Sequence, residues 1–169
     1  IYRYSLSSNS LAAEQGLELT KGNFDITAFY GVDEKRGKFY YQAATPSPLD
    51  RQIWEGDLNG GDARLLTPTS GTHEAAFSPT FEYFTHIWSD ANTPPVVHIC
   101  DLNDDTLRVI NKNERVKRLR NEYGFVEKEF IQIPIKSSSG WEGVLNGWML
   151  RPAVLDTLKK YPILFDNYG

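Results

Sequence analysis

The sequence predicts a mainly β protein whose larger part is a partial β-propeller of about two four-stranded antiparallel blades. The 169 residues are 40% hydrophobic and include nine Tyr, nine Phe and four Trp. Flat aromatic side chains of this kind cover a pleated surface well. Up to about residue 110, short alternating stretches are punctuated by turn residues. Their layout repeats after about 45 residues, which is in the range of a propeller blade.

The first complete repeat begins at Phe24. Its polar connection VDEKRG (32–37) ends in glycine and predicts a hairpin, and NGGD (59–62) predicts a tight turn. Four short antiparallel strands in one unit are the sequence sign of a propeller blade. The four expected strands are residues 24–31, 38–44, 51–58 and 63–67.

The second repeat has the same order of strands and turns. Its expected strands are residues 75–79, 83–89, 96–102 and 106–110. Three closing strands can be laid over one another: LELT (17–20), RLLT (64–67) and LRVI (107–110). Only about two and a half units are present, whereas a closed propeller typically needs four to eight. The propeller is therefore expected to be incomplete here, and a β-sandwich with coincidental spacing is the alternative.

The character of the sequence changes at Asn111. The stretch NKNERVKRLR (111–120) carries five cations in ten positions and predicts a short basic helix or a linker, which we place at residues 111–124. A function could be claimed for such a run. A solvated helix face is the better interpretation, because no aromatic residues interleave with the charges and the flanks are acidic.

A second domain is expected to begin at residue 125 and to continue to residue 169. Strands are expected at residues 125–134 and 144–151, separated by a Ser/Gly turn. The run YPILF (161–165) is apolar throughout, which is typical of a strand buried on both faces. It leads directly into DNYG (166–169), so we expect both ends of the chain to be cuts through a longer protein.

Charge and hydropathy exclude several classes of partner. A net charge of −4 makes nucleic acid an unexpected partner, since phosphate binding needs clustered Lys and Arg. No run of about 18 apolar residues is present, so no membrane-spanning helix is expected. Cys100 is the only cysteine and cannot form an internal disulfide. Its strand setting, VVHIC (96–100), favours a buried side chain over a reactive thiol.

Motifs for hydrolysis, metal binding and nucleotide binding are absent. No serine has glycine two positions before and two after it, so the chain lacks the nucleophile elbow of an α/β-hydrolase. The stretch beginning at Asp101 hints at a calcium loop but has no glycine at its sixth position, and Lys112 stands where a bidentate Glu belongs. There is no G-x-G-x-x-G. No cofactor is expected.

The histidines also predict no metal site, because they lie on or beside different expected strands without close ligand spacing. With His98, Cys100 forms a pair on one strand face at most. Structural or surface roles are expected for these side chains, which are His73, His86, His98 and Cys100. The setting of Tyr168, at the exit of the apolar run, by itself favours a residue at the rim of the domain.

Over essentially its whole length the chain resembles the dipeptidyl peptidase IV branch of the prolyl oligopeptidase family. The most specific stretch is KKYPILFDNYG (159–169). The order and spacing of several weaker stretches support it: LTKGNFDI (19–26), YGVDE (30–34), FYY (39–41), RLLT (64–67), GTH (71–73), AFSP (76–79), TPPV (93–96) and LRVI (107–110).

This resemblance implies an eight-bladed propeller over an α/β-hydrolase domain in an enzyme that removes N-terminal X-Pro or X-Ala dipeptides from peptides. Residues 1–110 are similar to its last blades and residues 125–169 to the first hydrolase strands. Tyr168 matches the tyrosine whose hydroxyl contributes to the oxyanion hole. The resemblance further implies a homodimeric parent located in the periplasm, outside the cell or at its surface. The Ser, Asp and His of the triad have no counterpart here, so the chain alone is expected to be inactive.

The alternative from another class is a stand-alone propeller-like module that binds a peptide or glycan without catalysis. Such a module has no use for a buried strand that runs into a turn at the C-terminus, which favours the peptidase. An open blade array also has unpaired sheet edges. We therefore expect the isolated chain either to self-associate or to leave the residues beyond about 150 poorly packed.

Overall fold

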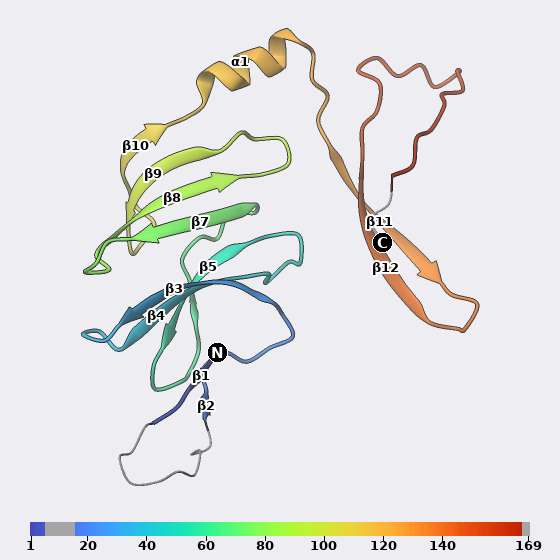
Figure 1. Cartoon of the computed structure of the whole chain (residues 1–169). Helices are drawn as coiled ribbons and strands as arrows, with labels where there is room; N and C mark the ends of the chain where they lie inside the picture. Colours follow the sequence, from blue (N-terminus) through green and yellow to red (C-terminus); the bar gives the residue numbers. More distant parts are fainter. Residues whose placement is uncertain (6–15, 167–169) are drawn as a thin grey trace. The chain divides into compact units, whose positions relative to one another are not determined.

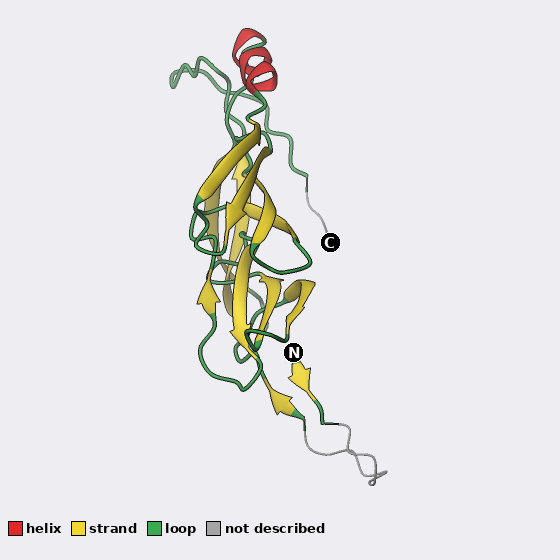
Figure 2. Ribbon diagram, turned by 90° about the vertical axis from the view of Figure 1, so that its left-hand side faces the viewer, coloured by secondary structure: helices red, strands yellow, loops and turns green. Residues whose placement is uncertain are grey.

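The computed structural model describes residues 1–5 and 16–166 of the chain. The contacts divide the chain into two compact units, Ile1–Lys117 and Arg118–Gly169. Strands prevail among the described residues, as Figure 2 shows, and they form several antiparallel sheets. The prediction of a mainly β protein is therefore confirmed.

The first four-stranded sheet consists of consecutive strands that lie side by side in chain order (Figure 1). They are β3 (Ile26–Asp33), β4 (Lys38–Ala43), β5 (Gln52–Asp57) and β6 (Arg64–Leu65). Every residue from Phe39 to Ala43 in β4 is buried. Because successive side chains of a strand point to opposite faces, this burial means that both faces of the sheet are covered.

The second four-stranded sheet repeats this topology. Its strands, again paired in chain order, are β7 (Thr72–Phe77), β8 (Tyr83–Ser89), β9 (Val96–Asp101) and β10 (Thr106–Asn111). The turn after the third strand is alike in both sheets. The Asn59 backbone N–H donates to Asp57 Oδ1 at 2.8 Å, and the Asn103 N–H donates to Asp101 Oδ1 at 2.8 Å. These matching turns confirm the internal repeat that the sequence predicts.

An aromatic core joins the two sheets. The Tyr40 ring of β4 lies 4.6 Å from the Phe77 ring of β7 and 5.2 Å from that of Phe81. Ile53, Leu66, Phe84 and Cys100 complete the buried cluster. The backbone N–H of Ala75 donates to the Tyr30 hydroxyl at 3.3 Å, which adds a polar link between the sheets.

The opposite face of the first sheet is covered by the N-terminal segment. There β1 (Tyr2–Arg3) pairs with β2 (Leu17–Glu18), and the Leu19 N–H donates to the Ile1 carbonyl at 2.9 Å. Leu19 packs into a second cluster with Phe39, Tyr41 and Ala43. The second sheet has no such cover among the described residues, and every residue of its outermost strand, β10, is exposed.

Gly71 marks the crossing from the first sheet to the second. Its φ is +130°, and a Cβ there would lie 2.6 Å from the Ser89 carbonyl oxygen and 2.7 Å from Trp88 Nε1. Its own N–H donates to Asp50 Oδ1 at 2.8 Å. Only glycine combines this backbone conformation with so close an approach.

Residues 111–120 were predicted as a helix or a linker, and the structure has the helix α1 (Glu114–Glu122), all of it exposed or half-buried. Gly124, whose φ is +62°, follows shortly after its last residue. The N–H of Phe125 donates to the Arg120 carbonyl at 2.9 Å, which is the long hydrogen bond of a Schellman cap. Within the described residues, no helix has the length and apolar character needed to cross a membrane.

The second unit contains one regular hairpin, in which β11 (Glu129–Lys136) pairs with β12 (Glu142–Met149) over eight residue pairs. Large apolar side chains on it are exposed, among them Phe130, Trp141 and Trp148. A two-stranded hairpin is marginally stable on its own. Its exposed apolar surface is therefore the kind that further chain would cover.

The prediction of a buried strand at 161–165 is wrong for this structure. Among the described residues 151–166 none lies in a strand, and Ile163, Leu164 and Phe165 are 76%, 94% and 87% exposed. An internal strand is stabilised by hydrogen bonds to neighbours on both sides and by cover on both faces. The described chain supplies neither to this run, which agrees with the expectation that residues beyond about 150 are poorly packed.

Candidate functional site

The one catalytic residue that the resemblance implies, Tyr168, lies outside the described residues, so its role stays a prediction. The described tyrosine nearest to it in the sequence, Tyr161, accepts a hydrogen bond from the Asp156 backbone N–H through its hydroxyl, at 2.9 Å. That bond holds the connection 156–161 as a local turn and leaves the phenol of Tyr161 no evident chemical task.

The structure brings together side chains that the sequence spacing keeps apart. His73 on β7, His86 on β8, and His98 and Cys100 on β9 all belong to one face of the second sheet, since Ala75 pairs with His86 and His86 pairs with His98. His86 lies directly opposite His98, and Cys100 is one step diagonal to it. The prediction that His98 and Cys100 form a pair at most is therefore wrong, because the strand pairing adds His86.

A chain of hydrogen bonds fixes the protons of two imidazoles. His73 Nε2 lies 2.7 Å from the Thr69 carbonyl oxygen, and His73 Nδ1 lies 2.8 Å from His86 Nε2. A carbonyl only accepts, so Nε2 of His73 carries a proton and, in the neutral ring, Nδ1 accepts from His86 Nε2–H. In that tautomer the lone pair of His86 is at Nδ1, where the Cys100 thiol can donate to it, with Sγ 3.9 Å away.

That nitrogen lies beside a carboxylate and a thiol. His86 Nδ1 lies 3.1 Å from Asp104 Oδ1 and 3.9 Å from Cys100 Sγ. Asp104 is in the β9–β10 turn with a φ of +62°, and its Oδ1 is buried without a hydrogen-bond partner. One nitrogen each of His86 and His98 and the sulfur of Cys100 lie within 4.8 Å of one another, so these three residues could hold a metal ion.

Burial sets the protonation of this group. It lowers the pKa of His73 below its usual value, the neighbouring His86 acting in the same direction. Burial likewise lowers the pKa of His98, again with help from His86. Burial, followed by the Asp104 carboxylate, raises the pKa of the Cys100 thiol to about 11. The cysteine is 1% exposed, as predicted, and at neutral pH it is a protonated thiol and no nucleophile.

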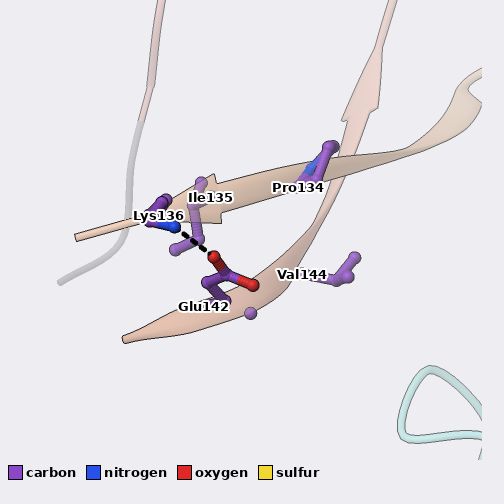
Figure 3. A pocket seen from close by; sticks show the side chains of 6 residues that line it. Pro134, Ile135, Lys136, Glu142 and Val144 are labelled. Atoms are coloured by element: carbon purple, nitrogen blue, oxygen red, sulfur yellow. Dashed lines mark hydrogen bonds and ion pairs between the residues drawn. The ribbon is translucent and has the colours of Figure 1, made fainter. Parts of the chain in front are cut away.

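Two surface depressions among the described residues hold no catalytic group. The first, of about 460 Å³, is open to solvent on the β11–β12 hairpin, and Figure 3 shows the ion pair Lys136–Glu142 at 2.5 Å across it. Its lining residues are Pro134, Ile135, Lys136, Glu142, Gly143 and Val144. An exposed ion pair between apolar neighbours gives this depression no arrangement suited to catalysis.

The second depression lies where the β3–β4 turn meets the β7–β8 turn. Arg36 links the two turns: its guanidinium is ion-paired with Asp33, and its Nη2 donates to the carbonyl oxygens of Thr80 at 2.9 Å and Phe81 at 2.7 Å. Although burial opposes it, the hydrogen bonds and charge of Arg36 hold the pKa of Asp33 below its usual value. Through these contacts Arg36 links the two sheets structurally.

Similarity to known proteins assigns the chain to a family. Residues 1–95 match the family model described as the dipeptidyl peptidase IV (DPP IV) N-terminal region. The chain is 28% identical over 156 residues to probable dipeptidyl-aminopeptidase B of Trichophyton verrucosum and 31% identical over 157 residues to that of Penicillium rubens. Each match covers 89% of this chain and 17% of the fungal protein.

Solved structures agree with these matches. The crystal structure of Porphyromonas gingivalis dipeptidyl peptidase 4 is 32% identical, with a TM-score of 0.72, over 88% of this chain and 20% of that protein. A putative dipeptidyl aminopeptidase IV from Bacteroides ovatus shares the fold with a TM-score of 0.67 at 22% identity, over 89% of this chain and 20% of that one. The chain thus spans about a fifth of the length of these relatives or less. Since the family model matches more than half of it, the chain belongs to the dipeptidyl peptidase IV family.

Proposed function

We propose that this chain is part of a dipeptidyl peptidase IV-like serine exopeptidase, an enzyme that removes X-Pro and X-Ala dipeptides from the N-termini of peptides. The observation that carries the proposal is the family match over residues 1–95. It is supported by relatives whose names are dipeptidyl-aminopeptidase B and dipeptidyl peptidase 4. The parent enzyme acts on peptide substrates and, in this proposal, as a homodimer.

In this proposal the two four-stranded sheets are consecutive propeller blades, and β1 with β2 contributes the outer strands of the blade before them. Each sheet is a meander of four consecutive strands. Sandwich domains are typically built with Greek-key connections, so the strand order favours blades. Stacking through the Tyr40–Phe77 contact is what adjacent blades require, because a single four-stranded sheet cannot cover its own faces.

The hairpin β11–β12 and the run at 161–165 are assigned to the start of the hydrolase domain. Their exposed apolar side chains, such as Trp148 at 53% and Leu164 at 94%, are the support for this assignment. Exposed apolar surface of this extent is uncommon on a complete soluble domain. The remaining sheet of the hydrolase domain would pair with the run and bury it on both faces.

Within the parent enzyme, Tyr168 is assigned to the oxyanion hole. Its phenolic O–H would donate to the oxygen that becomes negative when a serine attacks the scissile carbonyl. That charge develops on the way to the tetrahedral intermediate, so the donor stabilises the transition state more than the bound substrate. A single oxyanion-hole donor contributes about 2.7–4 kcal/mol in a well-studied serine protease. The attacking serine must come from outside residues 1–169, which contain no nucleophile elbow.

The test compares the chain alone with a longer protein that continues beyond Gly169, using the p-nitroanilides of Gly-Pro and Ala-Pro. We expect the longer protein to release p-nitroaniline and to be blocked by a serine-directed phosphonate or fluorophosphonate. The chain alone should release p-nitroaniline no faster than the substrate does in buffer without protein. The same peptides with a blocked N-terminus should not be cleaved by either protein, because an exopeptidase requires the free amine.

Two outcomes would contradict the proposal. Turnover by the chain alone that a serine-directed reagent abolishes would show that it carries its own nucleophile. A longer protein that binds the peptides without cleaving them would favour the binding module.

A further inference from the structure

The side-chain group around His86 brings a ring nitrogen, a carboxylate oxygen and a sulfur close together in a buried place. His86 Nδ1 lies 3.1 Å from the Asp104 carboxylate, while its Nε2 is hydrogen-bonded to His73. Asp104 Oδ1 is buried and makes no hydrogen bond, although it is this close. A ring nitrogen and a carboxylate oxygen thus lie close together in a buried place, an arrangement that a positive charge between them would stabilise.

A proton on His86 Nδ1 is the simplest candidate for that charge. Asp104 Oδ1 lies 3.1 Å from this nitrogen, but it makes no hydrogen bond. The nearby thiol of Cys100, 3.9 Å from the same nitrogen, does not supply the missing charge either. A cation that binds several lone pairs at once suits the arrangement better than a single proton.

We propose that His86, His98, Cys100 and Asp104 form a zinc-binding site within the second sheet. The ligand atoms would be His86 Nδ1, one ring nitrogen of His98, Cys100 Sγ and Asp104 Oδ1. This site is independent of the peptidase activity proposed above, since none of its residues belongs to the catalytic machinery.

The distances and the ligand types fit a tetrahedral zinc ion. Zinc–nitrogen and zinc–sulfur bonds of about 2.0–2.3 Å place the ligand atoms of a tetrahedral site roughly 3.3–3.8 Å apart. Here one ligand atom each of His86, His98 and Cys100 lies within 4.8 Å of the other two, with 3.9 Å between His86 Nδ1 and Cys100 Sγ. Asp104 Oδ1 lies 3.1 Å from His86 Nδ1 but outside this group of three, so its side chain must shift to become the fourth ligand. Thiolate and imidazole together select zinc over magnesium and calcium, which prefer oxygen ligands.

His73 would position the site without binding the metal. It is 1% exposed and stacks on His86 with ring centroids 5.0 Å apart. By accepting from His86 Nε2–H it holds the His86 ring in the tautomer that leaves Nδ1 free, and Thr69 fixes His73 in turn. Metal-binding histidines commonly have such partners, whose loss lowers metal affinity. Bound zinc would cross-link β8, β9 and the β9–β10 turn, and Cys100 would give its thiol proton to solvent.

The test is zinc binding by the full-length protein after chelator treatment, measured by competition with a chromophoric zinc chelator. We expect one equivalent of Zn²⁺ and a Zn²⁺-dependent rise in the midpoint of thermal unfolding. In the Co²⁺ form, a thiolate-to-metal charge-transfer band should appear. Cys100→Ser should abolish that band, and His98→Gln should lower zinc affinity by at least about 10-fold. His98 is half-buried, so its variant remains informative even if Cys100→Ser does not fold.

Asp104→Asn and Asp105→Asn form a matched pair, because both remove one negative charge from the same turn. Asparagine tolerates the positive φ of residue 104, so the first change leaves the turn intact. We expect Asp104→Asn to weaken zinc binding and Asp105→Asn to leave it unchanged. The proposal is overturned if the wild-type protein binds no stoichiometric Zn²⁺. Equal zinc affinity in the wild type, Cys100→Ser and His98→Gln would also overturn it.

Discussion

A single hydroxyl distinguishes Tyr168 from phenylalanine, which makes this position the sharpest test of the oxyanion-hole assignment. In the active parent enzyme, Tyr168→Phe should lower kcat by about 10²-fold or more while KM changes little, because the lost donor acts mainly in the transition state. Steady-state kinetics on Ala-Pro p-nitroanilide measure both constants.

Tyr161→Phe is the matched control for this change. It also removes one phenolic hydroxyl, but one that accepts a hydrogen bond from Asp156 within a local turn. Its kcat should stay near that of the wild type, and thermal unfolding should show both variants folded. A Tyr168→Phe enzyme with unaltered kcat would exclude this phenol from the oxyanion hole.

At single positions the sequence predicts burial better than it predicts side-chain partners. The expectation that Cys100 is buried follows from the apolar stretch around it and is confirmed. The group around His86 was missed because spacing along the chain says little about neighbours across a sheet. The available signal was the strand register. If β8 and β9 form a hairpin centred on Asn92, His86 and His98 lie opposite each other. A shift of one residue would place another side chain there, so the register had to be known first.

Between elements, Arg36 is the contact whose loss should be easiest to measure. It joins the β3–β4 turn to the β7–β8 turn through Asp33 and two carbonyl groups. Arg36→Gln should lower the free energy of unfolding by about 1–2 kcal/mol at pH 7, a modest value because the guanidinium is partly exposed to solvent. Urea unfolding followed by circular dichroism measures the change, and Lys35→Gln in the same turn is the control.

The pH dependence of this difference follows from Asp33, whose pKa is held below its usual value of 3.8 in the folded protein. Its contribution to stability is full above that value and is lost as the pH falls through the lowered pKa. The gap between the wild type and Arg36→Gln should therefore narrow in acid. A gap that is the same at pH 7 and in acid would show that the ion pair is not its source.

Elements with local signals were predicted well. The eight strands of the two sheets lie within a few residues of their expected positions, because alternation and Gly or Asn turns mark them, as in NGGD (59–62). The helix ends at Glu122, two residues before Gly124, which is a local stop signal. The buried strand at 161–165 was predicted wrongly, because an apolar run indicates only that the segment is suited to buried surroundings. Those surroundings are not present in the described chain.

For the molecule as a whole, the exposed surface after residue 150 predicts where a protease first cuts. Trypsin should cleave the isolated chain after Lys159 or Lys160, in a segment without strands, well before it cleaves after Lys38 in β4. In the longer protein of the proposed function, the sites after Lys159 and Lys160 should become resistant as the run 161–165 is buried. Mass spectrometry of a trypsin time course identifies the order of cleavage.

Two results of this experiment would contradict the expectation. Simultaneous cleavage after Lys38 and Lys160 in the isolated chain would show that the first sheet is no better protected than the tail. Equal rates after Lys160 in the isolated chain and in the longer protein would show that the run is not buried there.

The unequal cover of the two sheets has a consequence for cooperativity. The first sheet has neighbours on both faces, while among the described residues the second has one, through the Tyr40–Phe77 contact. In a linear array of repeats, stability is close to a sum of nearest-neighbour couplings, so the member with the fewer neighbours frays first. Loss of order would then start at β10 and move inward toward β4. Zinc bound at His86, His98 and Cys100 would oppose it at the fraying end, so the proposed metal site lies where the array has the fewest contacts of its own.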